Sequence, residues 1–113
     1  MDKSSVWIVI PAYNEAKRIG AVLEHLKNKG YANLIVVNDG SQDNTAGVAS
    51  EHTQHVLSHV INRGAGAATK TGLEYAKQQD ASVIVTLDAD GQHAVDDLEL
   101  LVQPILENKA DVV

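Results

Sequence analysis

The stretch Val83-Ile84-Val85-Thr86-Leu87-Asp88-Ala89-Asp90 says most about the fold of this chain. Residues 83–87 form a continuous apolar, largely β-branched run, which is typical of a strand buried on both faces. Two carboxylates, one residue apart, follow directly where this strand is expected to end. A fully apolar strand that runs into polar residues is typical of a parallel sheet covered by helices.

Similar apolar runs recur along the chain and alternate with segments of helical period. We predict further strands at residues 6–10, 34–37 and, less clearly, 56–61. We predict helices at residues 15–28, from Asp43 or Asn44 to about residue 51, at 66–79 and at 95–108, with Pro104 kinking or dividing the last one. The alternation predicts an α/β fold, a Rossmann-like parallel sheet flanked by helices in the order βαβαβαβα.

The length of 113 residues fits a single domain spanning residues 1–113. Residues 110–113, Ala-Asp-Val-Val, resemble the start of a truncated fifth strand. We therefore expect the chain to be the N-terminal part of a longer enzyme.

Composition excludes several classes of function. The net charge of -6 argues against a nucleic-acid partner, because a phosphate backbone requires a basic surface. The chain has no cysteine, so it can form neither a disulfide nor a thiolate metal site. No apolar run approaches the roughly 20 residues of a membrane-spanning helix. We expect a cytoplasmic protein.

Three polar clusters follow predicted strands, and each is expected at the carboxyl end of its strand. They are residues 11–15 (Pro-Ala-Tyr-Asn-Glu), 38–41 (Asn-Asp-Gly-Ser) and 88–93 (Asp-Ala-Asp-Gly-Gln-His). Ligands of parallel α/β sheets bind outside the carboxyl ends of the strands. The three clusters are therefore expected to converge on one binding site.

Asp88 and Asp90 are the candidate metal ligands within this site. Two carboxylates at a strand end can share Mg²⁺ or Mn²⁺, which prefer oxygen ligands and keep positions open for a diphosphate. The alternative is that both residues only cap a turn. His93 lies close enough in sequence to reach a metal or a phosphate.

Other residues of the clusters have two interpretations each. Tyr13 either stacks on a nucleobase or packs on its loop, and Asp39 either accepts hydrogen bonds from a base or forms an Asx turn. Glu15 is equally well explained as a charge in the first turn of a helix. Arg63, with the following helix N-terminus, could bind an anion, although the small residues at 64–66 could instead allow close helix packing.

Histidines 52, 55 and 59 have a spacing that can suggest a zinc site. His55 and His59 are expected on one face of a strand, but no fourth ligand is evident in the sequence. We do not favour a metal role for these three histidines.

Taken together, the motifs resemble glycosyltransferase family 2. They are Val-Ile-Pro-Ala-Tyr-Asn-Glu at 9–15, Val-Val-Asn-Asp-Gly-Ser-x-Asp-x-Thr at 36–45, Asn-Arg-Gly at 62–64 and Leu-Asp-Ala-Asp-Gly-Gln-His at 87–93. The motifs span nearly the whole chain in the family's order, and the dolichyl- and polyprenyl-phosphate mannose or glucose synthases are the most similar members. Asn38 stands where many members have an aspartate.

The resemblance implies the nucleotide-binding half of a GT-A fold and an inverting transfer of a sugar from a UDP- or GDP-sugar donor. It also implies a DxD motif, with Asp90 the direct ligand of Mg²⁺ or Mn²⁺ and Gln92 near the sugar or phosphates. The nucleotide-binding residues that we predict on this basis are Pro11, Ala12, Tyr13, Glu15, Asp39, Arg63, Asp88, Ala89 and Gln92, and the metal ligands are Asp88 and Asp90.

The resemblance places the catalytic base and most of the acceptor site after residue 113. The acceptor is expected to be a polyprenyl phosphate or a saccharide, and the full-length protein could act at the cytoplasmic face of a membrane. The sequence leaves open which sugar and which base the donor carries, and whether the protein forms a homo-oligomer. Two alternatives are a non-catalytic nucleotide-binding module and a haloacid-dehalogenase-like phosphatase with Asp88 as nucleophile.

Overall fold

A computed structural model describes residues 3–89, 95–98, 100 and 102 of the chain. The elements follow in the order η1 (Lys3–Ser5), β1 (Val6–Ala12), α1 (Ile19–Asn28), β2 (Asn33–Asp39), α2 (Thr45–Ser50), β3 (His55–His59), α3 (Ala65–Gln78) and β4 (Val83–Thr86). Residues 95–98, 100 and 102 have helical backbone. Strands and helices alternate as the apolar pattern predicts.

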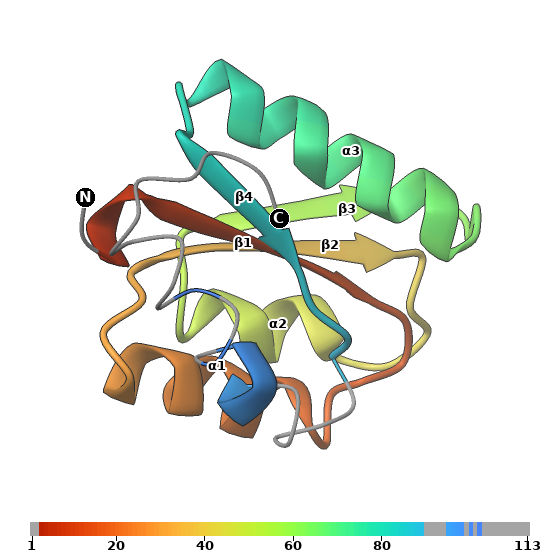
Figure 1. Ribbon diagram of the computed structural model, residues 1–113. Helices are drawn as coiled ribbons and strands as arrows, with labels where there is room; N and C mark the ends of the chain where they lie inside the picture. Colours follow the sequence, from red (N-terminus) through yellow and green to blue (C-terminus); the bar gives the residue numbers. More distant parts are fainter. Residues whose placement is uncertain (1–2, 90–94, 99, 101, 103–113) are drawn as a thin grey trace.

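The four described strands form one parallel sheet in the order β3-β2-β1-β4. Helices α1 and α2 lie on one side of this sheet and α3 on the other (Figure 1). The predicted α/β class, a Rossmann-like sheet flanked by helices, is therefore confirmed. The predicted fifth strand and the predicted helix after residue 102, with Pro104, lie outside the described residues.

Alternate residues of the strands face two separate cores. Val6, Ile8 and Ile10 of β1 pack with the buried side chains of α1 and with Val95, Leu98 and Val102. Val9 packs on the other face with Ala68 and Ala76 of α3. Burial on both faces explains why the strands have no alternation of apolar and polar residues.

Two predicted boundaries are wrong. The first helix begins at Ile19 instead of Glu15. Residues 16–18 form a turn, and the backbone N–H groups of residues 14–16 donate to the side chains of Ser41, Thr45 and Asp43. Strand β3 spans His55–His59 instead of 56–61, and Val60 and Ile61 follow it as exposed loop residues. None of the described helices is both long enough and apolar enough to cross a bilayer.

Candidate functional site

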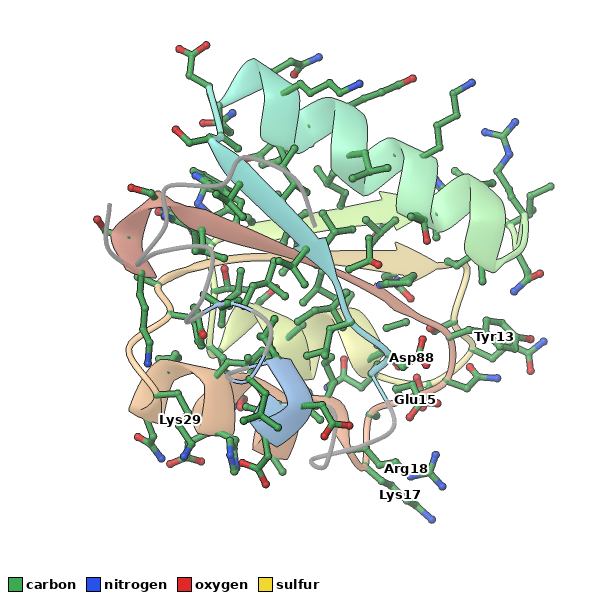
Figure 2. All side chains as sticks on the ribbon, in the orientation of Figure 1. Tyr13, Glu15, Lys17, Arg18, Lys29 and Asp88 are labelled. Carbon is green, nitrogen blue, oxygen red and sulfur yellow. The ribbon has the colours of Figure 1, made fainter. Side chains whose placement is uncertain are left out.

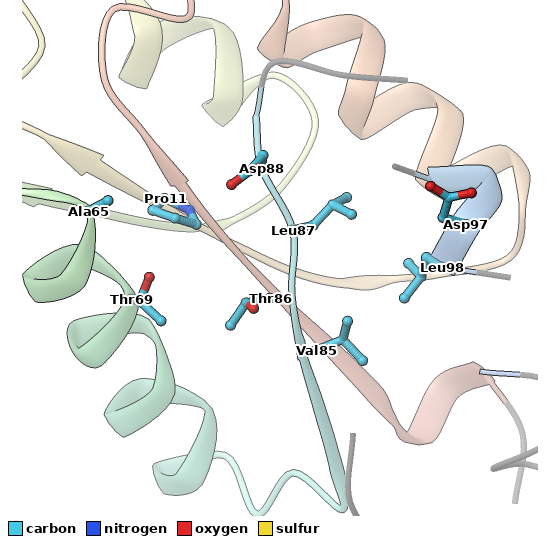
Figure 3. A pocket seen from close by; sticks show the side chains of 9 residues that line it. All are labelled: Pro11, Ala65, Thr69, Val85, Thr86, Leu87, Asp88, Asp97 and Leu98. Carbon is cyan, nitrogen blue, oxygen red and sulfur yellow. The ribbon is translucent and has the colours of Figure 1, made fainter. Parts of the chain in front are cut away.

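The carboxyl ends of β1, β2 and β4 enclose three adjoining hollows, of about 380, 300 and 270 Å³. Pro11 at the end of β1 and Asp88 after β4 line all three. We call these hollows together the rim trough. Figure 3 shows the largest of them, with Pro11 and Asp88 at one end and Thr69 of α3 and Thr86 of β4 along it.

Most of the predicted nucleotide-binding residues line the rim trough. Pro11, Ala12, Tyr13, Asp39 and Asp88 surround one hollow, together with Asn62, Ala65 and Ala68. Glu15 and Ala89 join Pro11, Tyr13 and Asp88 around another. Figure 2 shows Tyr13, Glu15 and Asp88 at the same end of the sheet. The predicted convergence of three sequence-distant clusters is therefore confirmed as geometry.

Asp39, the last residue of β2, is buried and fully oriented by its neighbours. Its Oδ1 accepts hydrogen bonds from the backbone N–H of Arg63 at 2.9 Å and from His59 Nδ1 at 2.8 Å. Its Oδ2 accepts one from the backbone N–H of Gly64 at 2.8 Å. A carboxylate oxygen accepts about two hydrogen bonds, so Oδ2 keeps room for another donor.

The protonation of Asp39 reflects two opposed effects. Burial raises the pKa of the Asp39 carboxyl, but the hydrogen bonds from His59, Arg63 and Gly64 outweigh it and hold the pKa below the ordinary 3.8. Asp39 therefore carries its negative charge at neutral pH. A buried carboxylate with this support is a strong acceptor for the N–H groups of a ligand.

His59 lies beside Asp39 because the two residues are register partners in the parallel pair β2–β3. An ionised carboxylate can only accept, so Nδ1 of His59 carries the hydrogen in their bond. The other ring nitrogen, Nε2, lies 2.9 Å from Oγ1 of Thr71 on α3. His59 is thus held from both sides, and it connects β2, β3 and α3.

The loops after β1 and β2 are joined by side chain–backbone hydrogen bonds. Thr45 Oγ1 accepts from the N–H of Glu15 at 2.9 Å, Ser41 Oγ from that of Asn14 at 2.9 Å, and Asp43 Oδ2 from that of Ala16 at 3.2 Å. In return, Asn14 Oδ1 accepts from the N–H of Gln42 at 2.8 Å. These bonds fix the backbone next to Tyr13.

Asp43 and Thr45 form the centre of this connection. The Thr45 hydroxyl donates to the Asp43 carboxylate, and the Thr45 N–H donates to the same oxygen at 3.0 Å. The hydroxyl bond is the main reason why the pKa of Asp43 lies below the ordinary 3.8. The prediction that Asp43 or Asn44 caps α2 is confirmed only in part, because Asn44 occupies the N-cap position without a side-chain hydrogen bond and Asp43 bonds to Thr45.

The remaining loop, between β3 and α3, approaches Gly40 closely. A Cβ atom at Gly40 would lie 2.4 Å from the backbone nitrogen of Asn62, and Gly40 has a φ of 71°. This approach brings the Arg63 and Gly64 N–H groups to Asp39. The close-packing interpretation of residues 64–66 is wrong at Gly64 and Gly66, where a Cβ would meet nothing within 4 Å.

Several predicted site residues stand apart from this group or cannot be placed. Arg63 contributes its backbone N–H to Asp39, and its side chain is not among the described ones that line the rim trough. Asp90, Gln92 and His93 lie outside the described residues. Within residues 3–89, 95–98, 100 and 102, no three His, Asp or Glu side chains are grouped as metal ligands would be. His55 contacts Tyr75, not His59.

Sequence reasoning missed His59, Thr71, Ser41, Asp43 and Thr45 as residues that support the site. The motif that contains Ser41, Asp43 and Thr45 was visible, but its partners lie 27 to 30 residues away in the loop after β1. His59 had no signal of this role in the sequence, because its pairing with Asp39 depends on the register of β2 and β3.

Comparison with known proteins shows which family this chain matches. The family model described as "Glycosyl transferase family 2" matches residues 7–113. An uncharacterized protein of Methanocaldococcus jannaschii is 43% identical over 106 residues, which are 94% of this chain and 44% of that protein. The UDP-N-acetylglucosamine–dolichyl-phosphate N-acetylglucosaminyltransferase of Methanococcus voltae is 38% identical over 125 aligned positions, covering 96% of this chain and 50% of that enzyme.

The solved structures include one described as a mycobacterial protein, which superimposes with a TM-score of 0.74 at 26% identity. The match covers 90% of this chain and 37% of that one. This chain therefore spans half or less of each of these three proteins. The family match, residues 7–113, includes every described residue of the rim trough.

Proposed function

The chain belongs to glycosyl transferase family 2, and from this premise we propose that its rim trough binds the nucleotide of a sugar-nucleotide donor. We propose that the full-length protein transfers the sugar to a polyprenyl phosphate. The acceptor follows from the relative in Methanococcus voltae, whose name gives a dolichyl phosphate. Because that name also gives a UDP-linked donor, UDP is the nucleotide to test first and GDP the second.

One observation carries the proposal: Tyr13, Asp39 and Asp88 come from three different strand ends and line one hollow. A nucleoside diphosphate presents an aromatic base, N–H donors and a charged diphosphate in sequence. Tyr13 is 44% exposed and offers a ring for stacking, while Asp39 offers a buried acceptor. Asp88 also lines the hollow, and we propose that the diphosphate binds next to it.

Asp88 fits the role of a metal ligand. Its side chain is exposed to solvent and lines all three hollows of the rim trough, and a carboxylate suits Mg²⁺ or Mn²⁺. We propose that Asp88 and Asp90 hold this ion. When bound, the ion would offset the charge that develops on the diphosphate leaving group.

We propose an inverting displacement. An oxygen of the acceptor forms a bond to the anomeric carbon as the bond from that carbon to the donor diphosphate breaks, and the nucleoside diphosphate leaves. The residues of this chain bind and orient the donor. We propose that a base for the acceptor proton lies after residue 113 and that the full-length protein acts at the cytoplasmic face of a membrane.

The phosphatase alternative is set aside because the chain belongs to a glycosyltransferase family. The non-catalytic alternative makes a distinct experimental prediction. The full-length protein, incubated with Mn²⁺, a radiolabelled UDP- or GDP-sugar and a short polyprenyl phosphate, is expected to form a lipid-linked sugar. Asp88→Asn and Asp90→Ala are expected to abolish this product. Nucleotide binding without any transfer, across the common donor sugars, would support the non-catalytic module instead.

A further inference from the structure

We infer that His59 is a positioning residue, which orients the Asp39 carboxylate for recognition of the nucleobase. The inference rests on the proposed function, because that proposal gives Asp39 its ligand. His59 does not line the hollow that Asp39 lines. It acts through Asp39.

The first support is the register of the sheet. Asp39 and His59 end β2 and β3 side by side, so their side chains leave the same face of the parallel pair. The bond from Nδ1 to Oδ1 is 2.8 Å long, and the His59 and Asp39 side chains are only 10% and 4% exposed. Shielding from water makes a hydrogen bond to a charged acceptor stronger than it would be at the surface.

The second support is the anchoring of His59 itself. Nε2 of His59 lies 2.9 Å from the Thr71 hydroxyl, and Oγ1 of Thr71 is also 3.0 Å from the carbonyl oxygen of Ala67 in the preceding turn of α3. The imidazole is therefore fixed by helix α3. The fixed position of the imidazole in turn orients the Asp39 carboxylate.

The third support is the different number of hydrogen-bond donors at the two oxygens of the Asp39 carboxylate. Oδ1 has two donors, His59 and Arg63, whereas Oδ2 has one, Gly64. With His59 in place, Oδ1 is saturated and the remaining acceptor position belongs to Oδ2. Without His59, only the Arg63 and Gly64 N–H groups hold the carboxylate, and Oδ1 regains an open acceptor position, so a ligand donor is no longer directed to Oδ2 alone.

The experiment compares two amides that mimic different nitrogens of the ring. In His59→Asn, the side-chain N–H₂ replaces Nδ1 and keeps a donor toward Asp39. In His59→Gln, the amide reaches toward the position of Nε2 and Thr71, and the donor toward Asp39 is lost. His59→Leu removes both. Binding of UDP, GDP and inorganic pyrophosphate, each with Mn²⁺, is measured by calorimetry on the full-length protein, with thermal unfolding as a check of the fold.

The expected result is that His59→Gln and His59→Leu bind the preferred nucleoside diphosphate about 10-fold more weakly, while pyrophosphate, which has no base, is unaffected. His59→Asn is expected to retain most of the wild-type affinity. His55→Leu is the matched control, since His55 also lies on β3 and contacts α3, through Tyr75, but is not near Asp39 in the register. It is expected to lower thermal stability without changing affinity.

Two outcomes would overturn the inference. Equal nucleotide affinity in His59→Gln, His59→Asn and the wild type would show that orientation by His59 is irrelevant. If pyrophosphate and nucleotide binding weakened equally, His59 would act by holding the loop at residues 62–64 in place, not by orienting Asp39 toward the nucleobase. If His59→Leu does not fold, the nucleotide affinities of His59→Asn and His59→Gln still test the inference. Failure of the wild type to bind either nucleotide would instead refute the proposed function.

Discussion

Asp39 and His59 are opposite one another at the last positions of two adjacent parallel strands, and their side chains meet at 2.8 Å beneath the floor of the rim trough. The same carboxylate receives the backbone N–H groups of Arg63 and Gly64. One buried charge therefore joins the ends of β2 and β3 to the start of α3. A ligand that bonds to Asp39 would bind to a side chain that the fold has already oriented.

Replacing this carboxylate should destabilise the fold. Asp39→Ala leaves the N–H groups of Arg63 and Gly64 and the Nδ1 of His59 without this acceptor, and we expect the free energy of unfolding to fall by about 3 kcal/mol. Urea denaturation measures this change. Asp80→Asn is the control, because Asp80 is exposed and has a φ of 58°, which asparagine tolerates. The control should stay within about 0.5 kcal/mol of the wild type, and an equal effect of both changes would contradict the account.

The lowered pKa values of Asp39 and Asp43 predict how stability depends on pH. Both carboxyls titrate below 3.8 in the folded chain, so the folded state binds fewer protons than the unfolded state in this range. Their contribution is present above pH 3.8 and is lost as the pH falls through their folded pKa values. Stability measured from about pH 6 down to about pH 3 should therefore decline. In Asp39→Asn the decline should be shallower, and an identical slope would show that Asp39 does not contribute.

Helix α3 contacts the sheet through a glycine. A Cβ atom at Gly72 would lie 2.3 Å from Cγ1 of Val9, so Gly72→Ala should force α3 away from β1 and cost about 1–3 kcal/mol. Gly66→Ala on the same helix is the matched control, since nothing lies within 4 Å of its added methyl group. The control should be neutral or stabilise by about 0.5 kcal/mol. The double variant Gly72→Ala with Val9→Ala should recover part of the loss.

The connection between the loops after β1 and β2 should matter for ligand binding as well as for stability. Thr45→Val removes the acceptor for the Glu15 N–H, two residues from Tyr13, and we expect nucleotide affinity to fall by about 5-fold. Thr53→Val is the control, because the Thr53 hydroxyl donates to the carbonyl of Leu34 at the opposite end of β2. Both variants should unfold at lower temperature. If Thr53→Val weakened nucleotide binding and Thr45→Val did not, the role given to Thr45 would be contradicted.

Much of this architecture could be predicted from the pattern of apolar residues. Residues 34–37 are buried on both faces, and Val83, Val85 and Leu87 are buried on one, so the apolar runs correctly predicted the strands, and the three polar clusters marked the carboxyl ends. The topology then brought Tyr13, Asp39 and Asp88 to one hollow, as expected. This part depends only on local composition and on the geometry of parallel sheets.

Two of the errors concern contacts between residues distant in sequence. Residues 15–18 have a helical pattern, but the helix begins at Ile19, and the N–H groups of Glu15 and Ala16 donate to Thr45 and Asp43. His59 was considered with His52 and His55 because of their spacing. Its actual partner, Asp39, is determined by strand register, which no local pattern within residues 52–59 reveals.

The most direct test of the account is a calorimetric titration of the full-length protein with UDP and with GDP, each with and without Mn²⁺. We expect one nucleotide to bind in a metal-dependent manner. Asp88→Asn should abolish the metal dependence, and Asp39→Asn should weaken the nucleotide without affecting pyrophosphate. Binding that is independent of both carboxylates, or no binding of either nucleotide to the folded protein, would contradict the assignment of the rim trough as the donor site.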